Sequence, residues 1–406
     1  EMSASLVGSE MCIRDRDETD DRITTFISKY AALSDKIKVE WIDPVLHPSA
    51  LTEYNTSQNT IYVSCEATGK STTISFDKIL VSDSSSYYYS GSSSYTSFDG
   101  EGQLSSAVNY VTSDVQKKIY TVTGHGEDSL STTITDLMTK NNYTTEELNL
   151  LMTDSIPDDC DLLLMDGPTN DLSDDEVSLL SGYLGEGGKV MCLLGDTGLA
   201  SLPKLAGLLK DYGIEGADGY IADPQRCYQN QPYYIFPVLN LSGDMADGIS
   251  SQMVLLMNSR GLTTTDPARD TITTSAFMTT SEQAYAVTEE DQKQGTYDLG
   301  VVATETISSD SKESRLTVIS AGSLIDQQIT DAFSQLENTQ VFMNAVTANF
   351  DGVTNLSIEA KSLTTEYNTV QHAGGFSILV VFGIPAVVLI GGFVVWFRSC
   401  LLYTSP

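Results

Sequence analysis

The sequence predicts a mixed α/β protein in which a small α/β unit precedes a larger domain with a doubly wound parallel sheet, and a transmembrane helix follows near the C-terminus. Two apolar runs, CDLLLMDGP from Cys160 and KVMCLLGD from Lys189, flank a helical stretch. Nearly continuous apolar strands joined by a helix are typical of a parallel sheet that is covered on both faces. The length of 406 residues is enough for two or three domains.

Residues 17–81 are expected to form the small α/β unit. ITTFISKYAALS has apolar residues near helical spacing, and a second helical stretch lies around residues 48–55. IKVEWID, NTIYVSC and STTISFDKIL have the composition of strands. The order strand, helix, strand, strand after an initial helix is that of a thioredoxin-like layer.

Residues 82–100 form a segment rich in serine and tyrosine. Between Ser82 and Ser97, nine of the 16 residues are Ser and four are Tyr. Because the segment has so few aliphatic side chains, we expect a solvated surface loop rather than a core strand. The alternative is that the tyrosines contact carbohydrate or a partner.

The larger domain is expected over residues 101–350, from the helix GQLSSAVNYVTSD and the strand that follows it. Ser173 and Glu176 fit a capping box, and Gly187 with Gly188 ends that helix before the next strand. MVLLMNS, DLGVVATET and RLTVISAGSLID are expected as later strands, followed by a helix near ENTQVFMNAVTANF. Residues 351–373 form a polar linker.

The segment from Gly374 to Phe397 contains 24 residues without a charge. A helix of that length is about 36 Å long, against roughly 30 Å of hydrocarbon in a bilayer. We therefore predict a single transmembrane helix, kinked at Pro385. Arg398 follows it directly, so we expect the C-terminus in the cytoplasm and the large domain outside it.

The two ends of the chain, residues 1–16 and the tail 398–406, do not continue the patterns beside them. EMSASLVGSEMCIRDR and SCLLYTSP resemble translated sequencing-adapter read-through. We set residues 1–16 and most of the tail aside as non-native sequence. The true N-terminus is then expected to be missing, and with it any earlier membrane helix.

The charge balance restricts the partners. The chain has 22 Lys and Arg against 55 Asp and Glu, a net charge of -33. A chain this acidic repels phosphate backbones and anionic lipid head groups, so nucleic acid is excluded as a partner and membrane attachment has to come from the apolar segment.

Cysteine spacing argues against structural zinc. Cys65, Cys160, Cys192 and Cys227, the cysteines outside the two ends, form no CxxC pair. Free buried thiols are favoured, and a disulfide between Cys160 and Cys192 is the alternative.

Candidate ligand or partner contacts lie where predicted parallel strands end, because ligands bind at that edge of such sheets. They are His125, Glu127, Asp166, Thr169 and Asp196. The turn from Gly124 to Glu127 lacks the GxGxxG spacing of a dinucleotide site and the Lys of a phosphate-binding loop, so no cofactor is expected. His125 with Glu127 fits a base and the residue that orients it, but a tight turn with local hydrogen bonds is favoured.

A hydrolase of the class I amidotransferase type would place a nucleophilic cysteine at the turn 193–198. Cys192 lies earlier, within the apolar strand, and neither His47, His125 nor His372 follows that turn at the distance such a pair needs. Burial would also disfavour the thiolate form of Cys192. The sequence therefore predicts no enzymatic activity, and the acidic strand ends show no metal-ligand spacing.

Several segments together resemble the gliding-motility auxiliary (GldG-like) family of proteins associated with ABC transporters. They are ISKYAALSDKIKVEWIDP, VTGHGE, the GPTxxLSxxE and YLxxGGK patterns between Gly167 and Lys189, and the C-terminal membrane helix. The resemblance covers nearly all of residues 17–398. It implies an extracytoplasmic module whose amidotransferase-like α/β domain lacks catalytic residues and works beside an ABC-2 type permease and a separate ATPase.

The chain departs from the family in its Ser/Tyr-rich loop and in lacking the N-terminal membrane helices that many relatives carry. The sequence thus predicts a non-catalytic, membrane-anchored accessory subunit that binds substrate or the permease. The alternatives are a cell-surface hydrolase of glycan or peptide and an adhesion module without a transporter.

Overall fold

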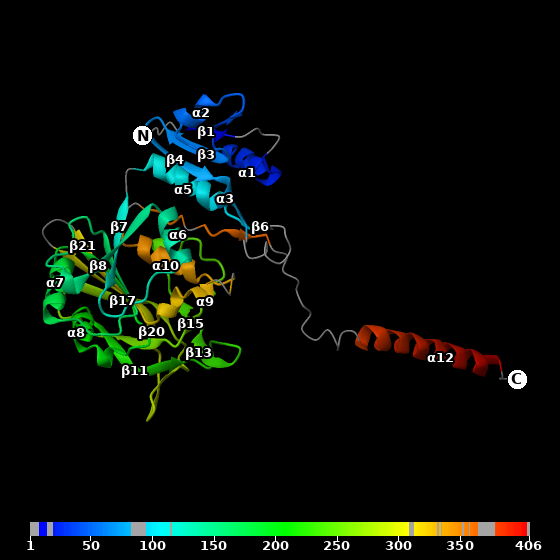
Figure 1. Ribbon diagram of the computed structural model, residues 1–406. Coiled ribbons are helices and arrows are strands. Elements are labelled where there is room, and N and C mark those ends of the chain that lie inside the picture. The colour runs from blue at the N-terminus through cyan, green and yellow to red at the C-terminus, as the bar shows by residue number, and fades with distance from the viewer. Residues whose placement is uncertain are drawn as a thin grey trace. The chain divides into compact units, whose positions relative to one another are not determined.

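The computed structural model describes residues 8–13, 19–82, 95–113, 116–307, 312–330, 333, 335–350, 353–356, 358–363 and 378–403 (Figure 1). The chain divides into two compact units, Glu1–Lys361 and Ser362–Pro406. The first unit holds all the α/β structure, and the second contains the apolar helix. The predicted mixed α/β class is confirmed, with a large sheet that contains parallel strands.

A small sheet forms near the N-terminus, with the strand order β2-β1-β3-β4. Strand β1 pairs parallel with β2 and antiparallel with β3, and β3 and β4 form an antiparallel pair. The strands are β1 (Gly8–Ile13), β2 (Ile37–Ile42), β3 (Thr60–Cys65) and β4 (Lys70–Ser75). The helices are α1 (Asp21–Ala31), α2 (Ser49–Glu53), α3 (Phe76–Ile79) and α5 (Gly100–Thr112).

Strand β1 falls inside residues 1–16, which the sequence analysis set aside. It lies between β2 and β3, with Met11 opposite both Glu40 and Tyr62. The predicted strand order therefore lacked one central strand, because a segment excluded for its unusual sequence contributed no pattern. The non-native origin of residues 1–16 stays a prediction.

Helix α5, which was predicted as the first element of the larger domain, packs in the core of the small sheet. It buries Leu104, Ala107 and Val111 in one apolar cluster with Ile23 and Ile61. The predicted domain boundaries stay a prediction, since residues 1–361 form one compact unit.

One short strand lies at each end of the Ser/Tyr-rich segment. Strand β5 (Leu80–Ser82) pairs antiparallel with β6 (Tyr95–Phe98), where a loop was predicted throughout. Tyr95 and its neighbours in β6 are exposed or half-buried, so these residues form a surface strand and not a core strand. Residues 83–94, which hold the other tyrosines of this segment, lie outside the described residues.

The larger sheet has 12 strands within the described residues. Its parallel half has the order β21-β10-β9-β7-β8. These strands are β7 (Lys117–Thr123), β8 (Tyr143–Asn149), β9 (Leu162–Asp166), β10 (Lys189–Leu193) and β21 (Lys312–Ile319). The predicted parallel sheet is therefore correct for this half.

The other half of the sheet is antiparallel, which corrects the prediction of a parallel sheet throughout. Strand β20 pairs antiparallel with β21 and β17 and begins this half. Short connections such as the one between β18 and β19 join antiparallel neighbours directly, without a crossover helix. The strands are β11 (Ile214–Ala222), β14 (Val238–Leu239), β16 (Arg260–Thr264), β17 (Ile272–Thr279), β18 (Tyr285–Val287), β19 (Gln292–Gln294) and β20 (Asp298–Ile307).

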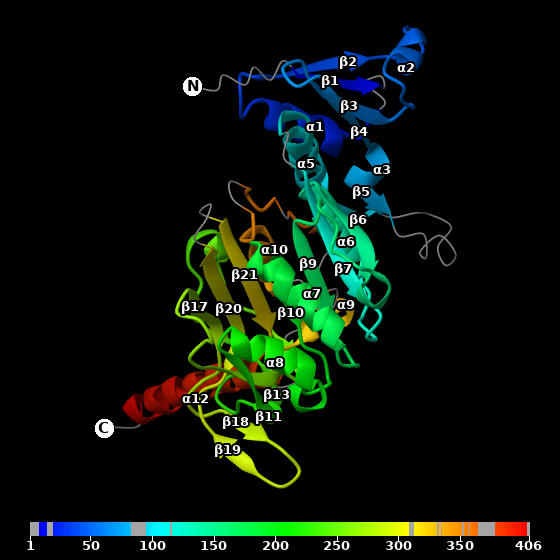
Figure 2. The same ribbon diagram turned by 90° about the vertical axis from the view of Figure 1, so that its left-hand side faces the viewer.

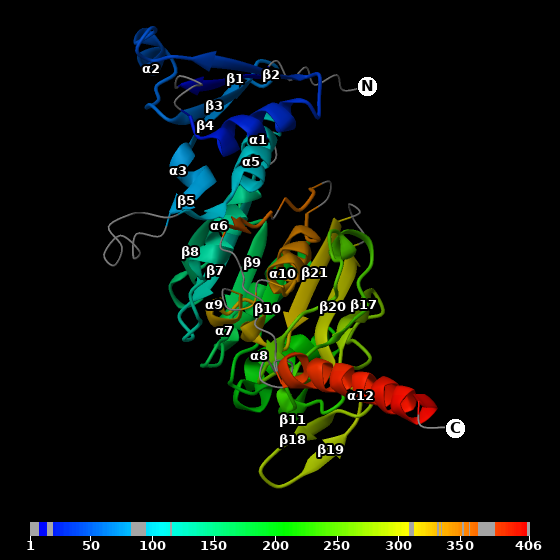
Figure 3. The same cartoon turned by 90° about the vertical axis from the view of Figure 1, so that its right-hand side faces the viewer.

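Helices cover both faces of the parallel half (Figures 2 and 3). Along β10, Met191 and Leu193 belong to one apolar cluster and Val190 and Cys192 to another, as the alternation of a strand requires. Helices α6 (Thr132–Lys140) and α10 (Asn338–Thr347) contribute to the first cluster, and α7 (Asp174–Gly185) and α8 (Pro203–Asp211) contribute to the second.

Shorter elements complete the first unit. Strands β12 (Cys227–Tyr228), β13 (Gln231–Ile235) and β15 (Leu256–Met257) form a separate small sheet. The remaining elements are η2 (Leu150–Met152), η3 (Leu199–Ser201), η4 (Gly243–Ala246), η5 (Gly322–Leu324), α9 (Gln327–Thr330) and, at the unit boundary, β22 (Lys361–Ser362).

The second unit contains the π-helical turn η6 (Leu379–Gly383) and helix α12 (Ile384–Tyr403). Within the described residues, Val380–Ser399 is the one helical stretch long and apolar enough to cross a membrane. Pro385 is the second residue of α12, just after the π-helical turn, and proline provides no N–H for the regular helical bond. The kink at Pro385 stays a prediction. The first predicted residues of the span, 374–377, lie outside the described residues.

Candidate functional site

The turn after β7 directs His125 into the interior. His125 is 2% exposed, and its ring lies between two carboxylates. Nδ1 is 3.1 Å from Oε1 of Glu127, and Nε2 is 3.2 Å from Oε2 of Glu176. The Glu127 and Glu176 side chains are 2% and 3% exposed. Because the imidazole and both carboxylates are enclosed, this cluster ties the turn to α7 rather than facing a ligand.

Backbone bonds fix the same turn. The backbone N–H of His125 donates to Oε2 of Glu127 at 2.7 Å, and the carbonyl oxygen of His125 accepts from the backbone N–H and hydroxyl of Thr169 at 2.9 and 3.0 Å. Gly126 has a φ of +76°, and a Cβ there would collide with the Thr169 hydroxyl. Glycine is therefore required by both backbone conformation and space, which favours the tight-turn interpretation of this motif.

Glu176 performs two tasks. The predicted capping box with Ser173 is present, and Oε2 of Glu176 accepts from the Ser173 backbone N–H at 2.8 Å. Burial raises the pKa of Glu176, but hydrogen bonds from Ser173 and His125 outweigh it, so the pKa lies below its usual value. The contact with His125 was not predicted, because nothing in the sequence shows which residues meet across 51 positions.

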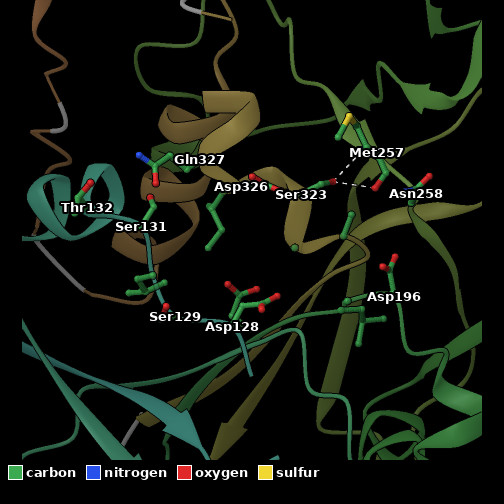
Figure 4. Close-up of a pocket in the computed structure, with 17 residues that line it drawn as sticks. Asp128, Ser129, Ser131, Thr132, Asp196, Met257, Asn258, Ser323, Asp326 and Gln327 are labelled. Atoms are coloured by element: carbon green, nitrogen blue, oxygen red, sulfur yellow. Dashed lines mark hydrogen bonds between the residues drawn. The ribbon is translucent and has the colours of Figure 1, made fainter. Parts of the chain in front are cut away.

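A polar pocket of about 610 Å³ opens at the carboxyl ends of β9, β10 and β21 and beside the start of α6 (Figure 4). We call it the strand-end pocket. Its carboxylates come from Asp128, Asp166, Asp196 and Asp326. Asp166 is the last residue of β9 and is 8% exposed, whereas the other three are exposed. The pocket therefore has one buried carboxylate and three at its mouth.

The close approach of two turns shapes the wall of this pocket. A Cβ built at Gly195 would lie 3.0 Å from Cα of Gly167, so the turns after β9 and β10 touch through glycines. The backbone N–H of Asp128 donates to the carbonyl oxygen of Asp166 at 2.8 Å, which connects the chain after β7 to the same edge. Parallel strands thus bring residues that are distant in the sequence to one edge.

Asp166 has an unusual electrostatic environment. Burial raises the pKa of Asp166 to about 7, and the negative charges of Asp128 and Asp326 contribute to the same direction. Its Oδ1 is buried and has no hydrogen-bond partner among the described residues. A carboxyl group with a pKa near neutrality exchanges protons or binds donors easily.

Cys192 does not form a nucleophile elbow. Its thiol is buried on β10, and burial together with the charges of Asp166 and Glu127 raises its pKa to about 12. The thiolate is therefore scarce at neutral pH. Cys65, Cys160, Cys192 and Cys227 are free thiols, so Cys160 and Cys192 form no disulfide although β9 and β10 are neighbours.

The five predicted site residues thus separate into two groups. Asp166 and Asp196 meet in the strand-end pocket, whereas His125, Glu127 and Thr169 do not line it. Sequence analysis missed Asp128 and Asp326. Asp128 directly follows the singled-out turn, and Asp326 is the last residue of the predicted strand segment RLTVISAGSLID, so their places at strand ends were the signal that could have found them. Within the described residues, no group of three or more His, Cys, Asp or Glu side chains is arranged to hold a metal ion.

Comparison with known families identifies the chain. The model of a family described as "ABC-type uncharacterized transport system" matches residues 116–351. The match covers more than half of the chain and begins at β7, where the larger domain starts. The chain therefore belongs to this family of ABC transporter auxiliary proteins.

The solved structures that are similar to this chain are distant. The N-terminal domain of mmIFT52 has 16% identity and a TM-score of 0.44, covering 58% of this chain and 98% of its own. A cytoplasmic protein from Salmonella typhimurium has 10% identity and a TM-score of 0.37, covering 57% and 98%. A ThuA-like protein from Bacteroides uniformis has 11% identity and a TM-score of 0.35, covering 60% and 96%. Comparison with curated proteins gave no match.

Proposed function

We propose that this chain is a membrane-anchored accessory subunit of an ABC-2 type transport system of the gliding-motility auxiliary (GldG-like) kind. It binds substrate or the permease outside the cytoplasm, catalyses no reaction itself, and depends on a separate ATPase for energy. The family match over residues 116–351 carries this proposal, because it spans the whole domain that holds the strand-end pocket.

The membrane part of the proposal rests on α12. The stretch Val380–Ser399 has the length and hydropathy of a membrane span, and Arg398 lies at its C-terminal end. A positive charge at that end favours the cytoplasmic side. The α/β unit then faces the outside of the cell membrane.

Finer features of the fold belong to the same proposal. The order β2-β1-β3-β4, with β1 and β2 parallel and β3 antiparallel, supports a thioredoxin-like first domain. The parallel half of the large sheet, covered by helices on both faces, supports an amidotransferase-like second domain without its nucleophile. We propose that both domains serve binding.

The test is isolation of the intact protein from membranes in mild detergent, followed by mass spectrometry of what co-purifies. We expect an ABC-2 permease and an ATPase at near-stoichiometric amounts. A matched chain in which an unrelated apolar helix replaces Val380–Ser399 should still recover both if the α/β unit makes the contacts. Recovery of the protein alone would contradict the proposal and leave the surface hydrolase and the adhesion module as the explanations to test.

One observation favours a second candidate, a cell-surface hydrolase of glycans. Burial raises the pKa of Asp166 to about 7, and Asp128 lines the same pocket; glycoside hydrolysis uses two carboxyl groups, one of which has a raised pKa and acts as the general acid. Release of reducing sugar from cell-wall glycan, lost in Asp166→Asn and kept in His125→Asn, would support this candidate. No release by the wild-type chain would exclude it.

A further inference from the structure

The strand-end pocket is lined by acidic side chains, which favours a positively charged ligand. Asp128, Asp166, Asp196 and Asp326 line it, and among the described residues no Lys or Arg does. The guanidinium group of Arg260 donates to the carbonyl oxygen of Asp196 and lies over the ring of Tyr220, 3.7 Å from its centroid. Arg260 is thus engaged with a backbone oxygen and an aromatic face, and among the described residues it forms no ion pair with the pocket carboxylates.

A second, independent observation comes from the floor of the pocket. Asp166 is more than nine-tenths buried, and its Oδ1 has no hydrogen-bond partner among the described residues. Buried polar atoms in folded proteins are nearly always paired, because an unpaired one loses its hydration without compensation. Asp166 lines the open pocket, so its carboxyl group, whose hydrogen-bonding capacity is incompletely used, is an acceptor for a donor group.

Two other polar side chains at the pocket wall already form hydrogen bonds within the protein. The hydroxyl of Ser323 donates to the carbonyl oxygen of Met257 at 3.0 Å and accepts from its N–H at 2.9 Å, the two bonds drawn in Figure 4. Oδ1 of Asp326 accepts from the backbone N–H of Gln328 at 2.8 Å. These bonds hold the wall in place, while Figure 4 shows Asp128, Asp196 and Asp326 around the same space.

We propose that the strand-end pocket binds a small organic cation with a primary amine, whose ammonium group donates to the carboxyl group of Asp166 and lies between the carboxylates of Asp128 and Asp326. The volume of about 610 Å³ is in the range of small-molecule sites. This inference rests on the proposed function, because it assigns the amine to the class of the transported substrate.

An organic cation fits better than a metal ion. The described residues hold no group of three or more His, Cys, Asp or Glu side chains placed to coordinate a metal. An ammonium group needs only one or two carboxylate acceptors at hydrogen-bond distance, and charge-assisted bonds of this kind are strong when partly buried. The buried Asp166 provides such an acceptor, and the exposed carboxylates at the mouth attract the cation.

Binding should depend on pH. The titratable groups that act on Asp166 are the carboxylates of Asp128 and Asp326, and Asp166 in turn acts on the Cys192 thiol, whose pKa of about 12 keeps it neutral. Because the pKa of Asp166 is about 7, its ionised form grows from pH 5 to pH 8. An aliphatic ammonium stays charged over this range, so the affinity should rise with pH and level off above 8.

The experiment is isothermal titration calorimetry on the purified full chain in detergent. The probe is putrescine, with 1,4-butanediol as its uncharged match and Mg²⁺ and Ca²⁺ as metal probes. We expect putrescine alone to bind, and Asp166→Asn and Asp128→Asn each to weaken it by about tenfold or more. Glu289→Gln, an exposed acid outside the pocket, is the matched control and should bind as the wild-type chain does.

Three outcomes would overturn the inference: binding of butanediol as tightly as putrescine, binding of the metal ions alone, or equal putrescine affinity in Asp166→Asn and the wild-type chain. A cooperative thermal unfolding transition, measured for each variant and compared with that of the wild-type chain, shows that the variant is folded. Failure here is separable from failure of the proposed function. Co-purification of permease and ATPase without putrescine binding rejects only the ligand class, whereas binding without those partners rejects only the transporter role.

Discussion

At the scale of a single residue, the buried carboxyl group of Asp166 controls how stability depends on pH. Its pKa of about 7 in the folded chain exceeds the ordinary value of 3.8. Between these values the folded state holds a proton that the unfolded state has lost, so this group lowers the free energy of unfolding progressively as the pH rises from about 4 to 7, and the effect levels off above 7. At pH 8 the ionised form costs on the order of 4 kcal/mol.

We therefore expect Asp166→Asn to remove this dependence. The variant should be about as stable as the wild-type chain at pH 4.5 and more stable at pH 8, because the amide has no charge to bury. Urea unfolding at both pH values measures the difference. Equal stability of the two chains at pH 8 would show that Asp166 is not an isolated buried charge. The exposed Glu289→Gln serves as the control, with unchanged stability at either pH.

At the scale of an element, the start of α7 depends on its cap. The Ser173 hydroxyl accepts from the backbone N–H of Glu176, and the Glu176 carboxylate accepts from the backbone N–H of Ser173. Asp174 and Asp175 add negative charge to the first turn. This charge interacts favourably with the positive end of the helix dipole. The cap also fixes the carboxylate that meets His125.

Ser173→Ala should lower the free energy of unfolding by about 1 kcal/mol, because one helix N–H loses its acceptor. Ser178→Ala on the same helix is the matched control, since its hydroxyl only donates to the exposed turn at Asp174 and its loss should change little. Denaturant midpoints of the two variants test this. A larger loss for Ser178→Ala than for Ser173→Ala would contradict the role assigned to the cap.

At the scale of the whole molecule, two lysine–acid pairs near the start of α5 differ in burial. Lys140 of α6 lies 2.8 Å from Asp99, with side chains 10% and 7% exposed, so this pair joins α6 to the start of α5 in a buried setting. Lys361 lies 2.6 Å from Glu101, with side chains 69% and 47% exposed. Desolvation makes the loss of one buried partner costly, whereas solvent screens the exposed pair.

We expect Asp99→Ala to destabilise the chain by about 3 kcal/mol, because Lys140 then remains buried without its carboxylate. Glu101→Ala should cost less than about 1 kcal/mol. Thermal unfolding of both variants under one buffer condition gives the comparison. Similar losses for the two would mean that burial does not set the strength of these pairs.

The division into two units makes a further expectation testable. Residues 1–361 contain the two largest sheets and their apolar clusters, so a chain that ends at Lys361 should fold and leave the membrane fraction. Circular dichroism and fractionation of expressing cells measure this. Aggregation of the shortened chain, or its recovery with the membranes, would show that the second unit is needed for folding or that another segment attaches it.

The sequence predicted those features that depend on local pattern. The apolar runs at β9 and β10, the capping box of α7 and the span at α12 each follow from neighbouring residues. Features that depend on distant pairing were missed. The antiparallel half of the sheet, the assignment of α5 to the first core and the meeting of Asp128 with Asp166 require contacts that no local period encodes.

The position of β21 has a consequence for biogenesis. This strand lies between β10 and β20, yet it is the last strand of its sheet along the chain. While the chain emerges from the ribosome or a translocon, one edge of β10 keeps its backbone N–H and C=O groups unpaired until β21 itself has been delivered. Open edges of this kind invite pairing with other chains, so the nascent domain is exposed to such pairing until its final strand arrives.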